Sequence, residues 1–99
     1  MNDTNIKNLK EAVGLACDAS NTPNILKGRN IILSMPKKWV LENIENVATE
    51  TLNLSDEWHF RRLLEVYETL DQNLVTKLIE FGLKSTNVEI VEAATDFKK

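Results

Sequence analysis

Few residues in this chain belong to the types that perform acid–base chemistry, act as nucleophiles or bind transition metals. The chain has one histidine, His59, and one cysteine, Cys17. A zinc site needs several Cys, His or carboxylate ligands at suitable spacing, and Asp56, one helical turn before His59, is the only near carboxylate on its face. A lone ionisable side chain is weak support for catalysis. We therefore predict that His59 is a surface or half-buried residue of a helix.

The surroundings of Cys17 predict a packing role rather than a reactive thiol. Cys17 follows Val13 and Ala16 on one side of a predicted helix, and no basic residue lies within one turn to lower its pKa. Free cysteines are among the residues most often buried. A single cysteine also excludes an internal disulfide and any multi-thiolate metal site, which fits a reducing compartment.

The sequence motifs of common enzymes are absent. The chain has no glycine-rich phosphate-binding loop, no Ser-His-Asp spacing, no pair of catalytic carboxylates and no CxxC motif. Its 99 residues make one domain, 1–99, which is too small for a core plus a deep, walled active site. We therefore predict a protein that is not an enzyme, with no catalytic residues, no metal site and no cofactor.

The segment 42–71 concentrates negative charge. It holds eight acidic residues against two basic ones, a local charge of −6, whereas the whole chain carries −3. One interpretation is an acidic patch that binds a basic partner. The other is a set of solvated helix faces with internal pairs, because Glu57 precedes Arg61 by four residues and Arg61 precedes Glu65 by four. The acidic residues are Glu42, Glu45, Glu50, Asp56, Glu57, Glu65, Glu68 and Asp71.

The two tryptophans stand at the edges of predicted apolar faces. Trp39 lies beside Val40 near the start of a predicted helix, and Trp58 falls one position off the face that begins at Phe60. An indole at such an edge either seals the core or anchors a binding partner. Together with charged residues of the acidic segment, the tryptophans give six candidate partner-binding residues. These are Trp39, Glu42, Glu45, Trp58, Arg61 and Glu65.

Six helices are predicted to position these residues. Short polar side chains at a helix start accept hydrogen bonds from free N–H groups, and proline is tolerated in the first turn. The run Ile31-Ile32-Leu33 would also suit a strand, but no second strand is available to pair with it. The first predicted helix runs from about Thr4 to Asp18. The second begins at a cap, Asn21 or Thr22, and contains Ile25, Leu26, Ile31, Ile32 and Leu33, and Pro36 opens the third. The fourth begins at a cap at Ser55, the fifth at a cap at Asp71 and the sixth at a cap at Thr86 or Asn87.

Apolar residues repeat along these segments at the spacing of an amphipathic helix, i, i+3, i+4 and i+7. Every connection is short, so successive helices must run roughly antiparallel. We therefore predict an all-α fold of about six short helices in antiparallel hairpins, stacked as a short right-handed solenoid or a compact bundle. The predicted inward residues are Val40, Ile44, Val47 and Ala48; Phe60, Leu63, Leu64, Tyr67 and Leu70; Leu74, Val75, Leu78 and Phe81; and Ile90, Ala93, Ala94 and Phe97.

The turn and helix near the end of the chain resemble the start of a HEAT-type repeat. In those repeats an Asp or Asn cap is followed by a β-branched residue and then by small alanine positions. The matching residues are Asn87, Ile90, Ala93 and Ala94. Val91 stands where those repeats usually have arginine. The resemblance covers roughly residues 55–98 and implies an α-solenoid fragment that binds proteins and carries no catalytic residues.

Charge and hydropathy argue against two classes of partner. Nucleic-acid binding rests on a basic surface, whereas this chain carries a net charge of −3. No apolar run approaches the ~20 residues that a membrane span needs. The first residues have neither the basic nor the apolar region of a signal peptide. We therefore expect a cytoplasmic protein that binds neither nucleic acid nor membranes.

These observations predict a non-catalytic protein–protein interaction module that acts through a helical-repeat surface, such as a bacterial regulatory or antitoxin-like protein. Its partner would be another protein, and a basic one if the acidic segment binds it. The alternative is a self-assembling structural domain whose end helices stack between copies, so homo-oligomerisation stays open. A small enzyme is the third hypothesis. An apolar outer face on the first or last helix would favour self-assembly, and a pocket with convergent polar groups would favour an enzyme.

Overall fold

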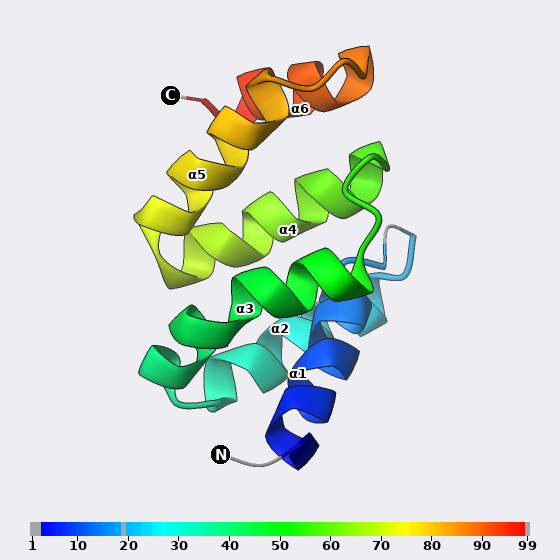
Figure 1. The fold of residues 1–99 in the computed structure, drawn as a ribbon. Helices are drawn as coiled ribbons and strands as arrows, with labels where there is room; N and C mark the ends of the chain where they lie inside the picture. The colour runs from blue at the N-terminus through cyan, green and yellow to red at the C-terminus, as the bar shows by residue number, and fades with distance from the viewer. Residues whose placement is uncertain (1–2, 19, 99) are drawn as a thin grey trace.

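Six α-helices and no strand make up the described part of the computed structural model, residues 3–18 and 20–98 (Figure 1). The all-α fold predicted from the sequence is therefore confirmed. The helices are α1 (Asp3–Ala16), α2 (Thr22–Ser34), α3 (Lys37–Thr51), α4 (Glu57–Leu70), α5 (Gln72–Leu83) and α6 (Val88–Phe97).

Polar side chains begin three of these helices where the sequence predicted them. Asn21 accepts a hydrogen bond from the N–H of Asn24 at the start of α2. Asp71 accepts one from the N–H of Asn73 at the start of α5. Asn87, one of the two predicted alternatives, caps α6. Each cap satisfies a backbone N–H that has no partner inside its own helix. Asp71 also ends α4, so a single residue turns the chain from α4 into α5.

The sequence misplaced the start of one helix and the end of another. The cap of α4 is Asp56 rather than Ser55, because the Asp56 carboxylate accepts hydrogen bonds from the N–H groups of both Trp58 and His59. An ionised acceptor also interacts favourably with the positive end of the helix dipole. The first helix ends at Ala16, two residues before the predicted end.

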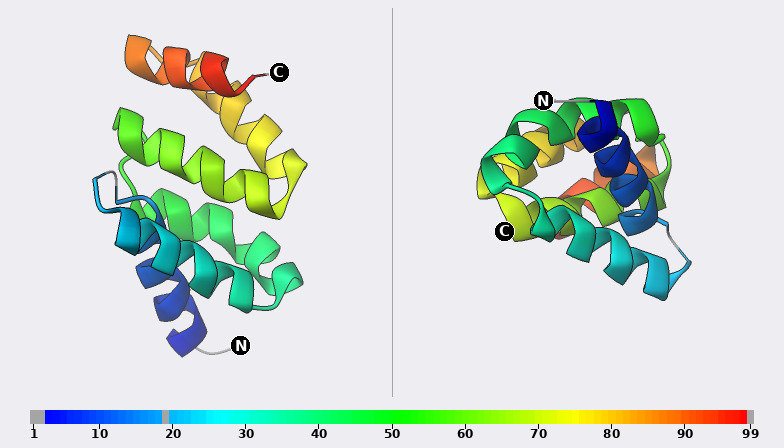
Figure 2. Two further views of the ribbon diagram at one scale, coloured as in Figure 1. Left: turned by 180° about the vertical axis from the view of Figure 1, so that it is seen from behind. Right: turned by 90° about the horizontal axis from the view of Figure 1, so that it is seen from below.

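The helices stack along the long axis of the molecule, which measures 37 × 26 × 22 Å. α1 and α6 lie at opposite ends, and α4 is the central helix, in contact with α1 and α3 on one side and with α5 and α6 on the other (Figure 1). Seen from behind, α2 crosses α1 (Figure 2). α3 and α5 both pack on α4 but make little direct contact with each other.

The crossing of α1 and α2 depends on Gly28. A Cβ atom at position 28 would collide with the backbone of Ala12 and Ala16. The structure shows that the missing side chain allows two helix backbones to approach more closely than any larger residue would permit.

One continuous apolar core runs through the stack. All the predicted inward residues of α3 and α4 are buried, as are those of α6 apart from the half-buried Phe97. The exception is Phe81 on α5, which is 57 % exposed. Its predicted inward position was wrong because the buried face of α5 is centred on Val75, Ile79 and Gly82, which places Phe81 at the edge.

Candidate functional site

A groove separates α3 from α5 on the surface of the molecule, with α4 as its floor. Three adjoining hollows form it, and Lys77 lines all of them. The central hollow has a volume of about 220 Å³. We call this feature the α3–α5 groove and define it by the residues of its central hollow. They are Glu45, Ala48, Thr49, Leu54, Leu63, Tyr67, Lys77, Leu78 and Phe81.

The floor of the groove combines apolar side chains with one phenol. Leu63 and Tyr67 project from the same face of α4, and Tyr67 is only 3 % exposed. The Tyr67 hydroxyl makes no hydrogen bond to the described residues, and its oxygen is not one of their fully buried unpartnered atoms, so it keeps some exposed surface. Burial raises the pKa of Tyr67, and the carboxylate of Glu45 raises it further. The phenol therefore stays protonated and is able to donate a hydrogen bond.

The mouth of the groove is apolar. Phe81 stands there largely exposed, and the half-buried Leu54 lines the same hollow. Single exposed apolar residues are common on protein surfaces. An exposed aromatic ring beside an apolar hollow is a more specific feature, because ligand sites pair a concave apolar lining with a few polar groups.

An ion pair crosses the groove. The Glu45 carboxylate on α3 lies 3.5 Å from the Lys77 ammonium on α5, and both side chains are about half exposed. Such a pair contributes little to stability, ~0–1 kcal/mol. The adjoining hollows add Asp71, Glu80 and Lys84, so acidic groups slightly outnumber basic ones around the groove.

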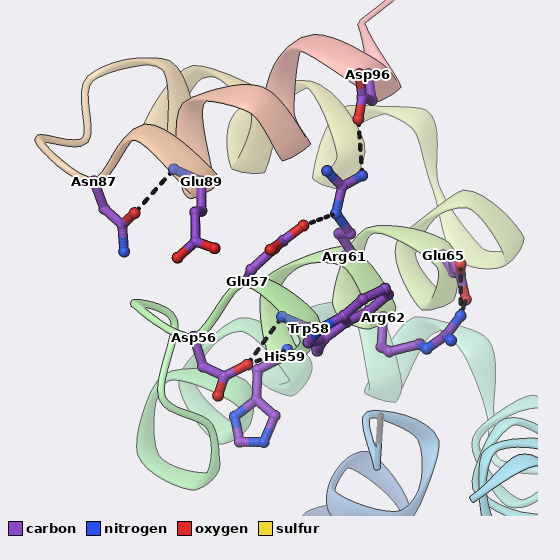
Figure 3. Close-up of polar contacts among 10 residues, drawn as sticks. All are labelled: Asp56, Glu57, Trp58, His59, Arg61, Arg62, Glu65, Asn87, Glu89 and Asp96. Carbon is purple, nitrogen blue, oxygen red and sulfur yellow. Dashed lines mark hydrogen bonds and ion pairs between the residues drawn. The ribbon is translucent and has the colours of Figure 1, made fainter. Parts of the chain in front are cut away.

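A second polar cluster lies on α4, on the helix face away from Leu63 and Tyr67. Glu65 accepts hydrogen bonds from Arg62 at 3.0 Å (Figure 3). It also accepts one from Arg29 of α2. The Arg62 guanidinium also lies 5.7 Å from the centre of the Trp58 ring, at the distance of a cation–π contact. Because Arg29 and Glu65 belong to different helices, 36 residues apart in the chain, we interpret this cluster as a link between α2 and α4.

A similar link joins α4 to α6. The Arg61 Nε donates to Glu57 at 2.7 Å, and its Nη1 donates to Asp96 at 2.9 Å (Figure 3). The hydrogen bond to Glu57 raises the pKa of Arg61, so the guanidinium stays charged. The predicted pair of Glu57 and Arg61 is confirmed. The predicted pair of Arg61 and Glu65 was wrong. Arg61 pairs with Asp96 of α6 instead, and Glu65 pairs with Arg29 of α2.

The acidic segment consists mostly of side chains that are already engaged. Glu45, Glu50, Glu57 and Glu65 take part in ion pairs. Asp56 and Asp71 cap helices. In the described part of the chain, Glu42 and Glu68 have neither role. The structure thus favours internal pairing over a continuous acidic binding face.

The six candidate residues therefore do not form one surface. Glu45 is the one that lines the α3–α5 groove. Glu42 is exposed on α3 outside it, and the half-buried Trp39 packs against the core beside Met35. Trp58 is 50 % exposed, so it does not seal the core. Arg61 and Glu65 are engaged in the two links described above.

His59 and Cys17 have the structural roles that the sequence predicted. The half-buried His59 accepts a hydrogen bond at Nδ1 from the N–H of Asn53, 3.1 Å away, which ties the α3–α4 connection to α4. Cys17 is fully buried, and burial raises the pKa of its thiol to about 12. No three His, Cys, Asp or Glu side chains in residues 3–18 and 20–98 come together as metal ligands.

The sequence did not identify Tyr67, Leu78 and Phe81 as site residues, because their spacing predicted core positions. One signal was present for Phe81. Ile79 and Gly82 extend the apolar face of α5 away from position 81, so a helical projection that includes them moves Phe81 to the boundary. The groove itself depends on how α3 and α5 sit on α4, which local periodicity does not specify.

No helix of the described residues is long and apolar enough to cross a membrane. Comparison with family models, with curated proteins and with solved structures finds no match for this chain.

Proposed function

We propose that this chain is a non-catalytic protein-binding module and that its α3–α5 groove receives the partner. The observation that carries the proposal is an apolar groove with an exposed phenylalanine at its mouth and an unpartnered hydroxyl in its floor. An interface centre has this composition, because aromatic anchors and well-packed apolar pockets contribute most of the binding energy. Phe81 and Tyr67 are the residues concerned.

Self-assembly through the end helices is supported less well. The exposed side chains described on α1 are all polar or charged, and those on α6 are polar apart from Val88. An end helix that stacked on a second copy would present a broad apolar face instead. Leu26 and Leu33, exposed on α2, are separated by polar residues and line no hollow described here.

Binding also accounts for the groove better than catalysis does. Its titratable groups are a phenol that stays protonated and a half-exposed ion pair, Glu45 with Lys77. A catalytic site would require several convergent polar groups, whereas the central hollow is lined mostly by apolar side chains. A regulatory or antitoxin-like protein acts by occupying its partner, and a small domain in the cytoplasm is suited to that task. The stacked helices also fit the proposed likeness to HEAT-type repeats, which bind proteins through such surfaces.

Site-specific photo-cross-linking in cells of the native host tests this proposal. Benzoylphenylalanine replaces Phe81 in one version of the protein and Val88, which is 69 % exposed but outside the groove, in a matched control. We expect irradiation to join a partner protein to position 81 and not to position 88. Equal adducts from both positions, or adducts from position 88 alone, would contradict the proposal. Circular dichroism establishes that both versions are folded.

A further inference from the structure

We propose that Arg29 of α2 and Arg62 of α4 form a binding site for an oxyanion, the carboxylate or phosphate group of a ligand. The site lies on the face of α4 away from the α3–α5 groove, so it does not depend on the proposed function. Two positive groups share one carboxylate there, which leaves positive charge and N–H donors without a partner.

The two guanidiniums converge on a single oxygen atom. Oε1 of Glu65 accepts hydrogen bonds from Nη2 of Arg29 and from Nη1 of Arg62, and Arg62 Nη1 also donates to Oε2. The cluster therefore has a net charge of +1, in a chain whose net charge is −3. Like charges held beside one oxygen repel each other, and a second anion would offset that repulsion.

Arg61, the residue before Arg62, shows the opposite arrangement. Its guanidinium donates from Nε to Glu57 and from Nη1 to Asp96, so two carboxylates surround one positive charge (Figure 3). A single arginine is therefore enough to link α4 to a neighbouring helix. The second arginine beside Glu65 adds positive charge that the link between α2 and α4 does not require.

Both arginines beside Glu65 leave donors free. Among the described residues, Arg29 donates only through Nη2 and Arg62 only through Nη1. The Nε atoms of both are buried without a partner, whereas buried side-chain donors usually have one. The other terminal nitrogens, Nη1 of Arg29 and Nη2 of Arg62, keep some exposed surface. A ligand can therefore reach one nitrogen of each arginine from solvent.

An oxyanion suits these donors. A guanidinium presents its N–H groups in one plane, in a geometry that matches the oxygens of a carboxylate or a phosphate. The side chains of Arg29 and Arg62 are 26 % and 25 % exposed, so their charges are reachable but partly shielded from salt. The ring of Trp58, 5.7 Å from the Arg62 guanidinium, restricts its orientation and is itself half exposed.

Nuclear magnetic resonance of the full chain labelled with ¹⁵N tests this proposal. The chain has three arginines, Arg29, Arg61 and Arg62, and each contributes one Nε–H signal. Inorganic phosphate or acetate is added at constant pH and ionic strength, with chloride as the control anion. We expect saturable shifts of the Arg29 and Arg62 signals and of the indole N–H signal of Trp58. The Arg61 signal should stay in place, because that guanidinium already has two carboxylate partners.

Two conservative variants provide the matched comparison. Arg62→Lys should raise the Kd for the bound oxyanion by about threefold or more, because lysine keeps the charge but lacks the planar donors. Arg61→Lys should leave that Kd within about twofold of the wild-type value. Circular dichroism establishes that both variants are folded.

The identity of the probe that binds distinguishes the two sources of oxyanion. Saturable shifts with phosphate alone would assign the site to a phosphate group, and saturable shifts with acetate would assign it to the carboxylate of an acidic ligand. Equal shifts at Arg61, or equal shifts with chloride, would contradict the proposal, since they would reflect a general response to salt. No saturable shift at Arg29 or Arg62, or wild-type affinity in Arg62→Lys, would overturn it as well.

Discussion

At the scale of single residues, burial decides which side chains are available for chemistry. Cys17 and Tyr67 are both almost completely buried, and burial raises the pKa of each. The thiol lies inside the core between helices, whereas the phenol lines a surface groove. The same physical effect therefore makes Cys17 inert and leaves Tyr67 as a hydrogen-bond donor toward a ligand.

The inertness of Cys17 has a direct chemical test. Only the thiolate reacts with iodoacetamide, and a pKa of about 12 keeps its population small at neutral and mildly alkaline pH. We expect alkylation of the native protein at about pH 8 to be slower by at least an order of magnitude than alkylation in urea. Mass spectrometry at timed intervals measures both rates. Similar rates in the two conditions would mean that Cys17 is accessible in the native state.

At the scale of the elements, three helix starts followed from a polar residue that precedes an apolar repeat, at Asn21, Asp71 and Asn87. The start of α4 was misplaced by one residue because Ser55 and Asp56 both suit a cap. Asp56 prevails because its carboxylate accepts two N–H groups.

Alanine substitution separates the two candidate caps of α4. Asp56→Ala should lower the free energy of unfolding by ~1 kcal/mol, because two N–H groups lose their acceptor. Ser55→Ala should change it by less than about 0.5 kcal/mol, as surface substitutions away from such features do. Urea denaturation measures both values. A larger loss at Ser55 than at Asp56 would place the cap one residue earlier.

The two glycines near α1 provide a matched test of the α1–α2 crossing. Gly28→Ala should destabilise the protein by ~1–3 kcal/mol, because the added methyl group meets the backbone of Ala12 and Ala16. Gly14→Ala, whose Cβ would lie 3.9 Å from the nearest atom, on Thr51, should stabilise it by ~0.4–1 kcal/mol. Thermal unfolding compares the two. An increase in melting temperature for both variants would show that the backbones of α1 and α2 leave room for a methyl group at position 28.

At the scale of the whole molecule, two polar links and one core hold the stack together. Arg29 joins α2 to Glu65 of α4, and Arg61 joins α4 to Asp96 of α6. These partners are 36 and 35 residues apart in the chain, so no local pattern predicts them. No local pattern predicts the α3–α5 groove either. The sequence located its residues on helices, but only the packing of α3 and α5 on α4 brings Glu45, Tyr67 and Phe81 together.

The affinity of the purified chain for the partner captured at position 81 tests the central claim most directly. Phe81→Ser removes the ring at the mouth of the groove, and Val88→Ser removes a comparably exposed apolar residue outside it. If the groove is the binding site, Phe81→Ser should raise the Kd by about tenfold or more, whereas Val88→Ser should leave it within about twofold. Wild-type affinity in the Phe81→Ser protein, or a loss confined to Val88→Ser, would place the binding surface elsewhere.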